Sequence, residues 1–145
     1  MRLGWLYLAW VVALVATAGS LYFSEVRHFV PCALCWWQRI FMYPLVPLLG
    51  IATFRQDVQV WRYGLPLATV GLATSTYHYL IQKVPGMAPP ASCASGVPCS
   101  AAYIDWYGFV TIPLLAGIAF ALITALLIGL ARSPDDEAPT DAGTP

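Results

Sequence analysis

Charged residues are scarce in this chain, where Asp, Glu, Lys and Arg together make up 10% of 145 residues. A soluble domain carries about 25% charged residues, so the scarcity argues against a soluble globular protein. Seven basic residues balance seven acidic ones, which leaves no basic surface of the kind that binds nucleic acid. Hydrophobic residues, in contrast, make up 59% of the sequence. This composition predicts an integral membrane protein.

The C-terminal tail lacks basic residues and large apolar residues. Residues 133–145 contain four of the acids, whereas residues 1–132 contain the other three and all seven basic residues. The tail is also rich in proline, and it cannot bury enough apolar surface to become ordered. We therefore predict a membrane domain over residues 1–132 and an acidic disordered tail over residues 133–145.

Four windows of the chain are long and apolar enough to cross a membrane. About 20 helical residues span a hydrocarbon core of about 30 Å. Backbone groups in lipid must satisfy their hydrogen bonds within the segment, so each window is expected to be a helix. The predicted spans are residues 5–23, 36–54, 63–81 and 107–131. They predict an all-α membrane protein, folded as a four-transmembrane-helix bundle.

Two features of these windows complicate this interpretation. Some prolines fall inside predicted helices, where neighbouring helices can accommodate a kink. They are Pro44, Pro47, Pro66 and Pro113. Ala16-Thr17-Ala18 resembles a signal-peptidase site, so cleavage of residues 1–18 is an alternative to a first span. The apolar run continues beyond this site to Phe23, which favours the span.

Basic residues are unevenly distributed between the predicted loops. One side of the membrane carries Arg2, Arg55, Arg62 and Arg132, and the other carries Arg27 and Lys83. Loops rich in basic residues stay in the cytoplasm, so both termini are expected to be cytoplasmic. Two spans separate Cys35 from Cys93, so all four cysteines face the same side. The charge rule makes that side the outside, where disulfides persist.

Cys32 and Cys35 form a C-x-x-C motif at the start of the second predicted span. The first turn of a helix carries partial positive charge and unpaired N–H groups, and both stabilise a thiolate. Arg39 follows Cys35 by four residues and so lies on the same helix face, where its charge also favours the thiolate. The alternatives are an inert disulfide and half of a zinc site. The position at a membrane-helix entrance favours a redox-active pair.

Cys93 and Cys99 form the second pair, with five residues between them in a Pro-, Gly- and Ser-rich loop over residues 83–106. Closing so small a ring stabilises little folded structure, because the stabilisation grows with loop length. A short exposed disulfide is better suited to exchange with an incoming thiolate, and a structural clasp is the alternative. Zinc bound by all four cysteines is disfavoured, because the second pair lacks the C-x-x-C spacing of zinc knuckles. We therefore predict no metal site.

Three polar residues within the predicted spans are candidates for ligand binding. Arg39 and His78 each lie three residues from the outer end of a span, and so roughly 5 Å below the interface. A polar head group can be held between them at that depth. The alternatives are that Arg39 only snorkels to the surface and that His78 only makes a hydrogen bond within the bundle. Gln38 is the weakest of the three candidates.

Three stretches of the sequence resemble a single protein family. Residues 32–39 read Cys-Ala-Leu-Cys-Trp-Trp-Gln-Arg and closely resemble the signature of the bacterial disulfide-bond formation protein B (DsbB) family. Residues 77–82 are similar to that family's His segment at the end of its third helix. Residues 108–113 are similar to the Gly-to-Pro opening of its fourth helix. The resemblance covers residues 1–132.

The resemblance implies a membrane disulfide oxidoreductase that supports disulfide bond formation. Such a protein lies in the bacterial cytoplasmic (inner) membrane and reoxidises a DsbA/BdbD-like thioredoxin-fold thiol oxidase outside the cytoplasm. It passes the electrons to the membrane quinone pool, which consists of ubiquinone or menaquinone. Its partners are therefore a thioredoxin-fold protein and a quinone, and no nucleic acid is involved.

The resemblance also implies roles for individual residues. By position, Cys32 and Cys35 are the quinone-coupled pair. Cys93 forms the mixed disulfide with the partner, and Cys99 completes the relay. Arg39 contacts the quinone. The cofactor-binding candidates are Arg39, His78 and Gln38.

The spacing of the second cysteine pair departs from the best-studied members of the family, which separate that pair by a much longer segment. The five intervening residues resemble the short-loop, BdbC-like branch. A vitamin K epoxide reductase-like enzyme is an alternative, but its loop cysteines precede the C-x-x-C, whereas here Cys32 and Cys35 come first. The remaining alternative is a non-enzymatic membrane subunit held by two structural disulfides.

Overall fold

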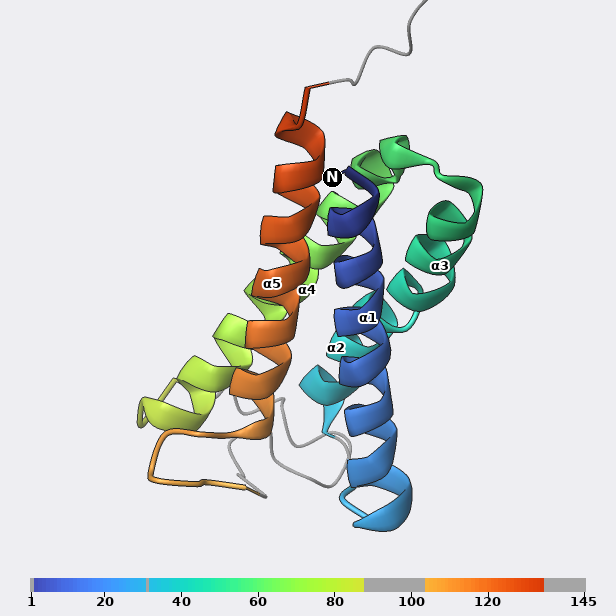
Figure 1. The fold of residues 1–145 in the computed structure, drawn as a ribbon. Coiled ribbons are helices and arrows are strands. Elements are labelled where there is room, and N and C mark those ends of the chain that lie inside the picture. The colour runs from blue at the N-terminus through green and yellow to red at the C-terminus, as the bar shows by residue number, and fades with distance from the viewer. Residues whose placement is uncertain (1, 31, 88–103, 135–145) are drawn as a thin grey trace, which may run out of the picture.

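The computed structural model describes residues 2–30, 32–87 and 104–134, and these residues form helices with no strand (Figure 1). Helix α1 covers Arg2–Leu21 and continues as a short π-helix, η1, over Tyr22–Val26. The other elements are α2 (Ala33–Met42), α3 (Leu45–Arg55), the 3-10 helix η2 (Val58–Val60), α4 (Trp61–Lys83) and α5 (Ile112–Arg132). The all-α fold predicted from the sequence is confirmed.

The helices form a four-segment bundle. Its segments, which we call legs, are α1, the α2–α3 pair, α4 and α5. Figure 1 shows α1 and α5 side by side and antiparallel, with α4 crossing behind them. Helix α5 packs against α1 and α4, while α3 packs against α1 and α2 against α4. At one end of the bundle α1 begins, α5 ends and α3 connects to α4. At the other end α2 begins, α4 ends and α5 begins, and we call it the cysteine end because it holds Cys32 and Cys35.

Apolar side chains from all four legs form the core. They are Leu6, Ala9 and Ala13 of α1, Met42 of α2, Leu45, Leu49 and Ala52 of α3, Val60 of η2, Ala68 of α4, and Phe120, Ile123, Leu127 and Leu130 of α5. Within α1, α3 and α5 these positions recur every three or four residues, so they share one face of each helix. Large apolar side chains also cover the outside, such as Phe54 at 79% and Val15 at 67% exposure. An apolar exterior of this kind is suited to contact with lipid.

Glycine allows α4 and α5 to approach each other closely. A Cβ atom at Gly71 would lie 2.2 Å from Cε1 of Phe120, well inside van der Waals contact. The Phe120 ring is fully buried and packs directly on this face of α4, so a Cβ atom at position 71 would displace it. This helix pair therefore requires a residue without a side chain at position 71.

The second predicted span consists of two helices rather than one. Helix α2 ends at Met42 and α3 begins at Leu45, with a turn at Tyr43 and Pro44 between them. Pro44 has no N–H to donate to a continuous helix, and it serves instead as the N-cap of α3. The single helix predicted over residues 36–54 is therefore corrected to a helix pair. Pro66, by contrast, lies inside α4, which continues through it.

The fourth predicted span begins later than expected, at Ile112 rather than at residue 107. The preceding residues form a tight turn closed by an antiparallel bridge between Trp106 and Val110. Tyr107 and Gly108 have φ angles of +55° and +80°, and a right-handed helix cannot contain such residues. Pro113 then falls in the first turn of α5, where its fixed φ angle suits a helix start.

Within the part of the chain that the structure describes, two helices have the length and hydropathy to cross a membrane by themselves, Arg2–Val26 and Ile112–Arg132. Helix α4 has 23 residues and extends roughly 34 Å, which also suffices to cross the hydrocarbon core. Helices α2 and α3 have 10 and 11 residues, so only together do they make a leg of comparable length. The tail from residue 135 onward lies outside the described residues, and its disorder stays a prediction.

Candidate active site

The C-x-x-C motif lies at the N-terminus of α2, as the sequence predicts. Cys32 is the N-cap residue, and its carbonyl accepts a hydrogen bond from the N–H of Trp36 at 3.1 Å. Cys35 lies in the first turn of the helix. The two Sγ atoms are 3.4 Å apart, and both are present as thiols. A small side-chain movement is therefore enough to join them in a disulfide.

The two thiols have different surroundings. Cys32 is only 4% exposed, whereas Cys35 is half-buried. The pKa of Cys32 is raised to about 11, first because its thiol is hydrogen-bonded to Cys35 and second because burial disfavours the charged form. The hydrogen bond with His78 acts in the opposite direction. In the dithiol state Cys32 is therefore protonated at neutral pH.

His78 of α4 links Cys32 to Gln38 inside the protein. Its Nε2 atom lies 3.5 Å from Sγ of Cys32, and its Nδ1 atom lies 3.0 Å from Nε2 of Gln38. His78 is 1% exposed and Gln38 is 6% exposed. Nδ1 accepts a hydrogen bond from the Gln38 amide N–H as the amide is oriented here, and the imidazole Nε2–H can then donate to Cys32. Reversing the amide would exchange these roles.

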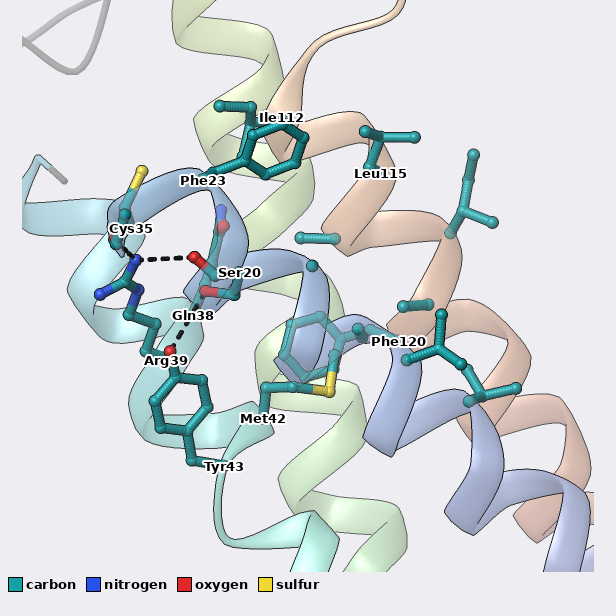
Figure 2. A pocket seen from close by; sticks show the side chains of 18 of the residues that line it. Ser20, Phe23, Cys35, Gln38, Arg39, Met42, Tyr43, Ile112, Leu115 and Phe120 are labelled. Carbon is teal, nitrogen blue, oxygen red and sulfur yellow. Dashed lines mark hydrogen bonds between the residues drawn. The ribbon is translucent and has the colours of Figure 1, made fainter. Parts of the chain in front are cut away.

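Cys35 lines a cavity of about 490 Å³ at the cysteine end, between α1, α2 and α5 (Figure 2). Ligand pockets in proteins commonly enclose roughly 300–1,000 Å³. Most of the lining is apolar, and much of it comes from α1 and α5. From these two helices come Val12, Val15, Ala16, Ile112, Leu115, Ala116, Ala119, Phe120 and Leu122, and Phe23 of η1 adds to them.

Polar groups line only the side of the cavity next to Cys35. The Nη2 atom of Arg39 donates to the Ser20 carbonyl at 3.2 Å and also to the Ser24 hydroxyl. The Ser20 hydroxyl lies 3.3 Å from the Tyr43 hydroxyl (Figure 2). We call this side of the cavity the polar wall, and it consists of Ser20, Ser24, Gln38, Arg39 and Tyr43. The Arg39 guanidinium also lies 5.4 Å from the centre of the Trp36 ring. These contacts hold the cation against the end of α1, rather than in solvent.

The structure brings three of the predicted site residues together at the cavity. Cys35, Gln38 and Arg39 line it, whereas His78 belongs to the buried side of the motif, against Cys32. Arg39 therefore lines the cavity, and His78 contacts the lining residue Gln38, while a head group held between Arg39 and His78 stays a prediction. Cys93 and Cys99 lie outside the described residues.

Sequence reasoning missed three polar members of the cavity wall, which are Ser20, Ser24 and Tyr43. Ser20 and Ser24 are four residues apart at the end of the first apolar window, so they share one helix face. That spacing was the only available signal, because small hydroxyl residues are common in membrane helices.

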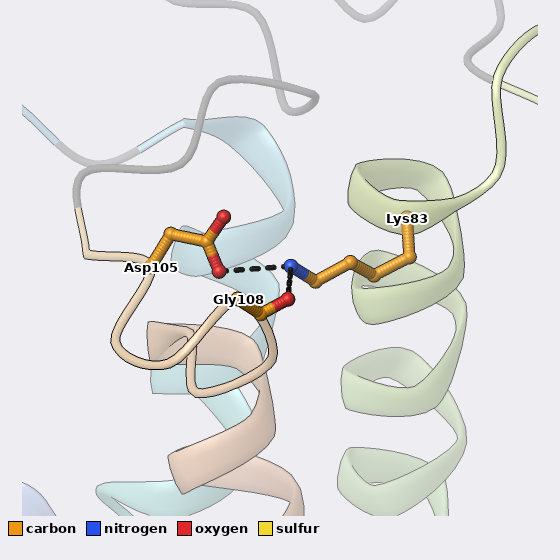
Figure 3. Close-up of polar contacts among 3 residues, drawn as sticks. All are labelled: Lys83, Asp105 and Gly108. Atoms are coloured by element: carbon orange, nitrogen blue, oxygen red, sulfur yellow. Dashed lines mark hydrogen bonds and ion pairs between the residues drawn. The ribbon is translucent and has the colours of Figure 1, made fainter.

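At the cysteine end, Lys83, Asp105 and Gly108 form a clamp between the last turn of α4 and the turn that precedes α5 (Figure 3). Lys83 Nζ lies 2.8 Å from a carboxylate oxygen of Asp105 and donates to the carbonyl of Gly108 at 2.7 Å. These bonds fix the turn that precedes α5 to the last turn of α4. They also fix one end of the segment that carries Cys93 and Cys99 in the sequence.

A family model described as "Disulfide bond formation protein DsbB" matches residues 2–130, which is nearly all of the helical bundle. The chain belongs to the DsbB family. This confirms the resemblance carried by residues 32–39 and makes the bundle an integral membrane protein with a role in disulfide bond formation.

Curated relatives of this DsbB family member include disulfide formation proteins, among them proteins C of Bacillus species. Disulfide bond formation protein C of Bacillus subtilis (strain 168) is 62% identical over 122 residues, covering 84% of this chain and 88% of that protein. Probable disulfide formation protein C 1 of Bacillus anthracis is 52% identical, covering 81% of this chain and 85% of the relative. A probable disulfide formation protein of Coxiella burnetii is 48% identical, with coverage of 85% and 84%. No solved structure matches the chain significantly.

Proposed function

We propose that this DsbB family member transfers electrons from a thioredoxin-fold thiol oxidase to a membrane quinone. The observation that carries the proposal is the position of Cys35, whose thiol lines an apolar cavity beside the Arg39 guanidinium. A cysteine that can be oxidised therefore lies next to a site for an apolar ligand. The family's role in disulfide bond formation supplies the reason for such a thiol to be oxidised.

The chemistry of the cavity fits a quinone with a prenyl tail. The long apolar wall between α1 and α5 can hold a hydrocarbon chain, because burial of apolar surface there is favourable. Quinone carbonyls are hydrogen-bond acceptors, and the polar wall offers donors from Arg39, Gln38 and Tyr43. A guanidinium has five N–H donors, and the two described hydrogen bonds of Arg39 use only Nη2.

The reaction is a two-electron exchange. A bound quinone accepts two electrons and two protons, and Cys32 and Cys35 lose the same number when their thiols become a disulfide. Cys35 faces the cavity and gives up its electrons there, while Arg39 and the first turn of α2 stabilise its thiolate. Cys32 is the buried partner that closes the disulfide, with His78 and Gln38 holding its thiol in place.

The second cysteine pair is the proposed entry point for electrons. A thiolate of the reduced partner attacks the Cys93–Cys99 disulfide, and Cys93 carries the transient mixed disulfide. The two electrons then pass to Cys32–Cys35 by thiol–disulfide exchange. We place all four cysteines outside the cytoplasm and both termini inside, in keeping with the distribution of basic residues.

A cavity-filling variant tests the quinone site directly. In Ala116→Phe the new ring occupies the cavity, so quinone reduction by the purified chain and a reduced thioredoxin-fold dithiol should fall at least tenfold. Ala121→Phe is the matched control, because Ala121 is exposed on the same helix and does not line the cavity. Equal rates in both variants would show that quinone is reduced elsewhere. Thiol titration of both variants verifies that Cys32 and Cys35 remain reactive.

A further inference from the structure

Three metal-binding atoms converge at the start of α2, and they are Sγ of Cys32, Sγ of Cys35 and a ring nitrogen of His78. All three lie within 4.8 Å of one another. The two sulfurs are 3.4 Å apart, and Sγ of Cys32 is 3.5 Å from Nε2 of His78. The C-x-x-C motif brings the two sulfurs together, and the packing of α2 on α4 brings the imidazole to them.

These separations are close to those of a tetrahedral zinc centre. With Zn–S bonds of about 2.3 Å and Zn–N bonds of about 2.0–2.1 Å, two sulfurs lie roughly 3.8 Å apart, and a sulfur and a nitrogen lie roughly 3.5–3.6 Å apart. The distance between Cys32 and His78 matches, and the two sulfurs need to move apart by only about 0.4 Å. Sγ of Cys35 lies within 4.8 Å of the His78 ring nitrogen, and Cys35 is half-buried at the edge of the cavity, where its side chain can adjust to the ion. Thiolate and imidazole donors select zinc and similar thiophilic ions over magnesium or calcium.

Gln38 supplies a further feature of metal-binding histidines. Such a histidine usually makes a hydrogen bond through its second ring nitrogen, which fixes the tautomer and the ring orientation. Here Nδ1 of His78 lies 3.0 Å from the Gln38 side-chain amide, so that Nε2 points toward Cys32. With the amide oxygen turned toward Nδ1, the imidazole donates from Nδ1 and leaves Nε2 as the ligand.

We propose that the reduced chain binds one thiophilic divalent cation of the Zn²⁺ class through Cys32, Cys35 and His78, with a fourth position open to water. Each thiol that ligates the ion loses its proton, and no electrons are transferred. Sulfurs joined in a disulfide cannot ligate the ion, so the metal binds only the dithiol form and holds it reduced. This site differs from a four-cysteine zinc centre, because it uses His78 and requires neither Cys93 nor Cys99.

The test is metal binding by the purified full-length chain in detergent, without quinone or partner, so its outcome is independent of the proposed function. Cobalt(II) is the probe, because tetrahedral thiolate coordination gives it intense visible absorption. The Cys93→Ser/Cys99→Ser double variant removes the other thiols. When reduced, it should bind one Co²⁺ per chain, and Zn²⁺ should displace the Co²⁺. After oxidation of Cys32 and Cys35 it should bind none.

Single substitutions in that double variant identify the ligands. Cys35→Ser should abolish the thiolate absorption, and His78→Ala should weaken binding at least tenfold and alter the spectrum. Gln38→Ala should weaken binding about ten- to hundredfold by releasing the imidazole. His28→Ala is the matched control, since His28 is exposed, and its binding should match the parent.

Two results would overturn the proposal. One is that the reduced double variant binds no Co²⁺ while its helical circular dichroism is normal. The other is that His78→Ala, with normal helical content, keeps the parent affinity and spectrum, which would show that the two thiols bind the ion without His78. If His78→Ala does not fold, His78→Asn replaces it. Co²⁺ binding by the reduced but not the oxidised double variant tests the dithiol requirement without any substitution at position 78.

Discussion

Cys32 and His78 are 46 positions apart in the sequence, yet Sγ of Cys32 lies 3.5 Å from Nε2 of His78. This contact ties the N-cap of α2 to the last turns of α4. The two sulfurs of the motif therefore have different surroundings, because Cys32 faces the buried imidazole while Cys35 faces the cavity. A dithiol with one buried and one cavity-facing sulfur can be oxidised from one side only.

The relay prediction separates the two cysteine pairs. In Cys93→Ser the partner should no longer be oxidised, because its entry disulfide is missing. A small dithiol should still drive quinone reduction through Cys32 and Cys35 at close to the normal rate. In Cys35→Ser, quinone reduction should vanish with every donor. If Cys93→Ser and Cys99→Ser both oxidise the partner normally, the second pair is only a structural clasp.

Packing of α4 on α5 gives a stability prediction. Gly71→Ala places a Cβ atom 2.2 Å from the Phe120 ring, and overpacking of this kind costs about 1–3 kcal/mol. The midpoint of thermal unfolding in detergent should fall. Gly4→Ala, where a Cβ atom meets nothing within 4 Å, should leave it unchanged. Adding Phe120→Leu to Gly71→Ala should recover part of the loss, and failure to do so would show that the clash is relieved elsewhere.

Local features of the site could be predicted from the sequence, and features that depend on packing could not. The C-x-x-C spacing alone places Cys32 at a helix cap and Cys35 in the first turn, and both positions are confirmed. The helix break at Pro44 was missed, because a proline inside an apolar window can either bend a helix or end it. The contact of His78 with Cys32 was missed because it depends on how α2 packs against α4, which no local pattern specifies.

The cavity could be anticipated only in part. Arg39 and Gln38 were candidates because they follow the motif within the same apolar window. The apolar walls come from α1 and α5, whose facing residues are determined by the arrangement of the bundle. Hydrophobic periodicity identifies a buried face of each helix, but a cavity forms where two such faces fail to meet.

The Lys83 clamp should affect the partner reaction more than stability. Both side chains are partly exposed, at 27% for Lys83 and 47% for Asp105, and such an ion pair contributes about 0.2–1 kcal/mol. Asp105→Asn should slow partner oxidation severalfold, because one end of the segment carrying Cys93 is no longer held. Quinone reduction driven by a small dithiol should not change. Asp57→Asn, at the opposite end of the bundle, is the control, and equal partner rates in both variants would remove the clamp from the mechanism.

Topology is tested by labelling in intact cells. The connection between α3 and α4 contains Asp57 and lies at the end of the bundle opposite Cys32 and Cys35. In variants that keep a single cysteine, a membrane-impermeant thiol reagent should label Cys93 from outside. It should label Asp57→Cys only after the membrane is opened. The reverse pattern would invert the proposed orientation of the bundle.

Arg39 gives the sharpest test of the quinone site. If it only anchors α2 at the interface, Arg39→Lys keeps the charge and should change little. If its planar guanidinium bridges the end of α1 and a quinone carbonyl, lysine is not equivalent, because one ammonium cannot reproduce donors in several fixed directions. Losing one hydrogen bond to a charged group costs about 1.5–3 kcal/mol, so the apparent KM for quinone should rise roughly ten- to hundredfold.

The control for this test is Arg55→Lys, an exposed arginine in the last turn of α3 at the other end of the bundle, which should leave quinone kinetics unchanged. Mixed-disulfide formation at Cys93 should be normal in Arg39→Lys, because the partner reacts before the electrons reach α2. A rise in the quinone KM with normal mixed-disulfide formation therefore assigns Arg39 to the quinone step. Unchanged quinone kinetics in both Arg39→Lys and Arg39→Gln would leave it an anchor, and the polar wall would then depend on Gln38 and Tyr43.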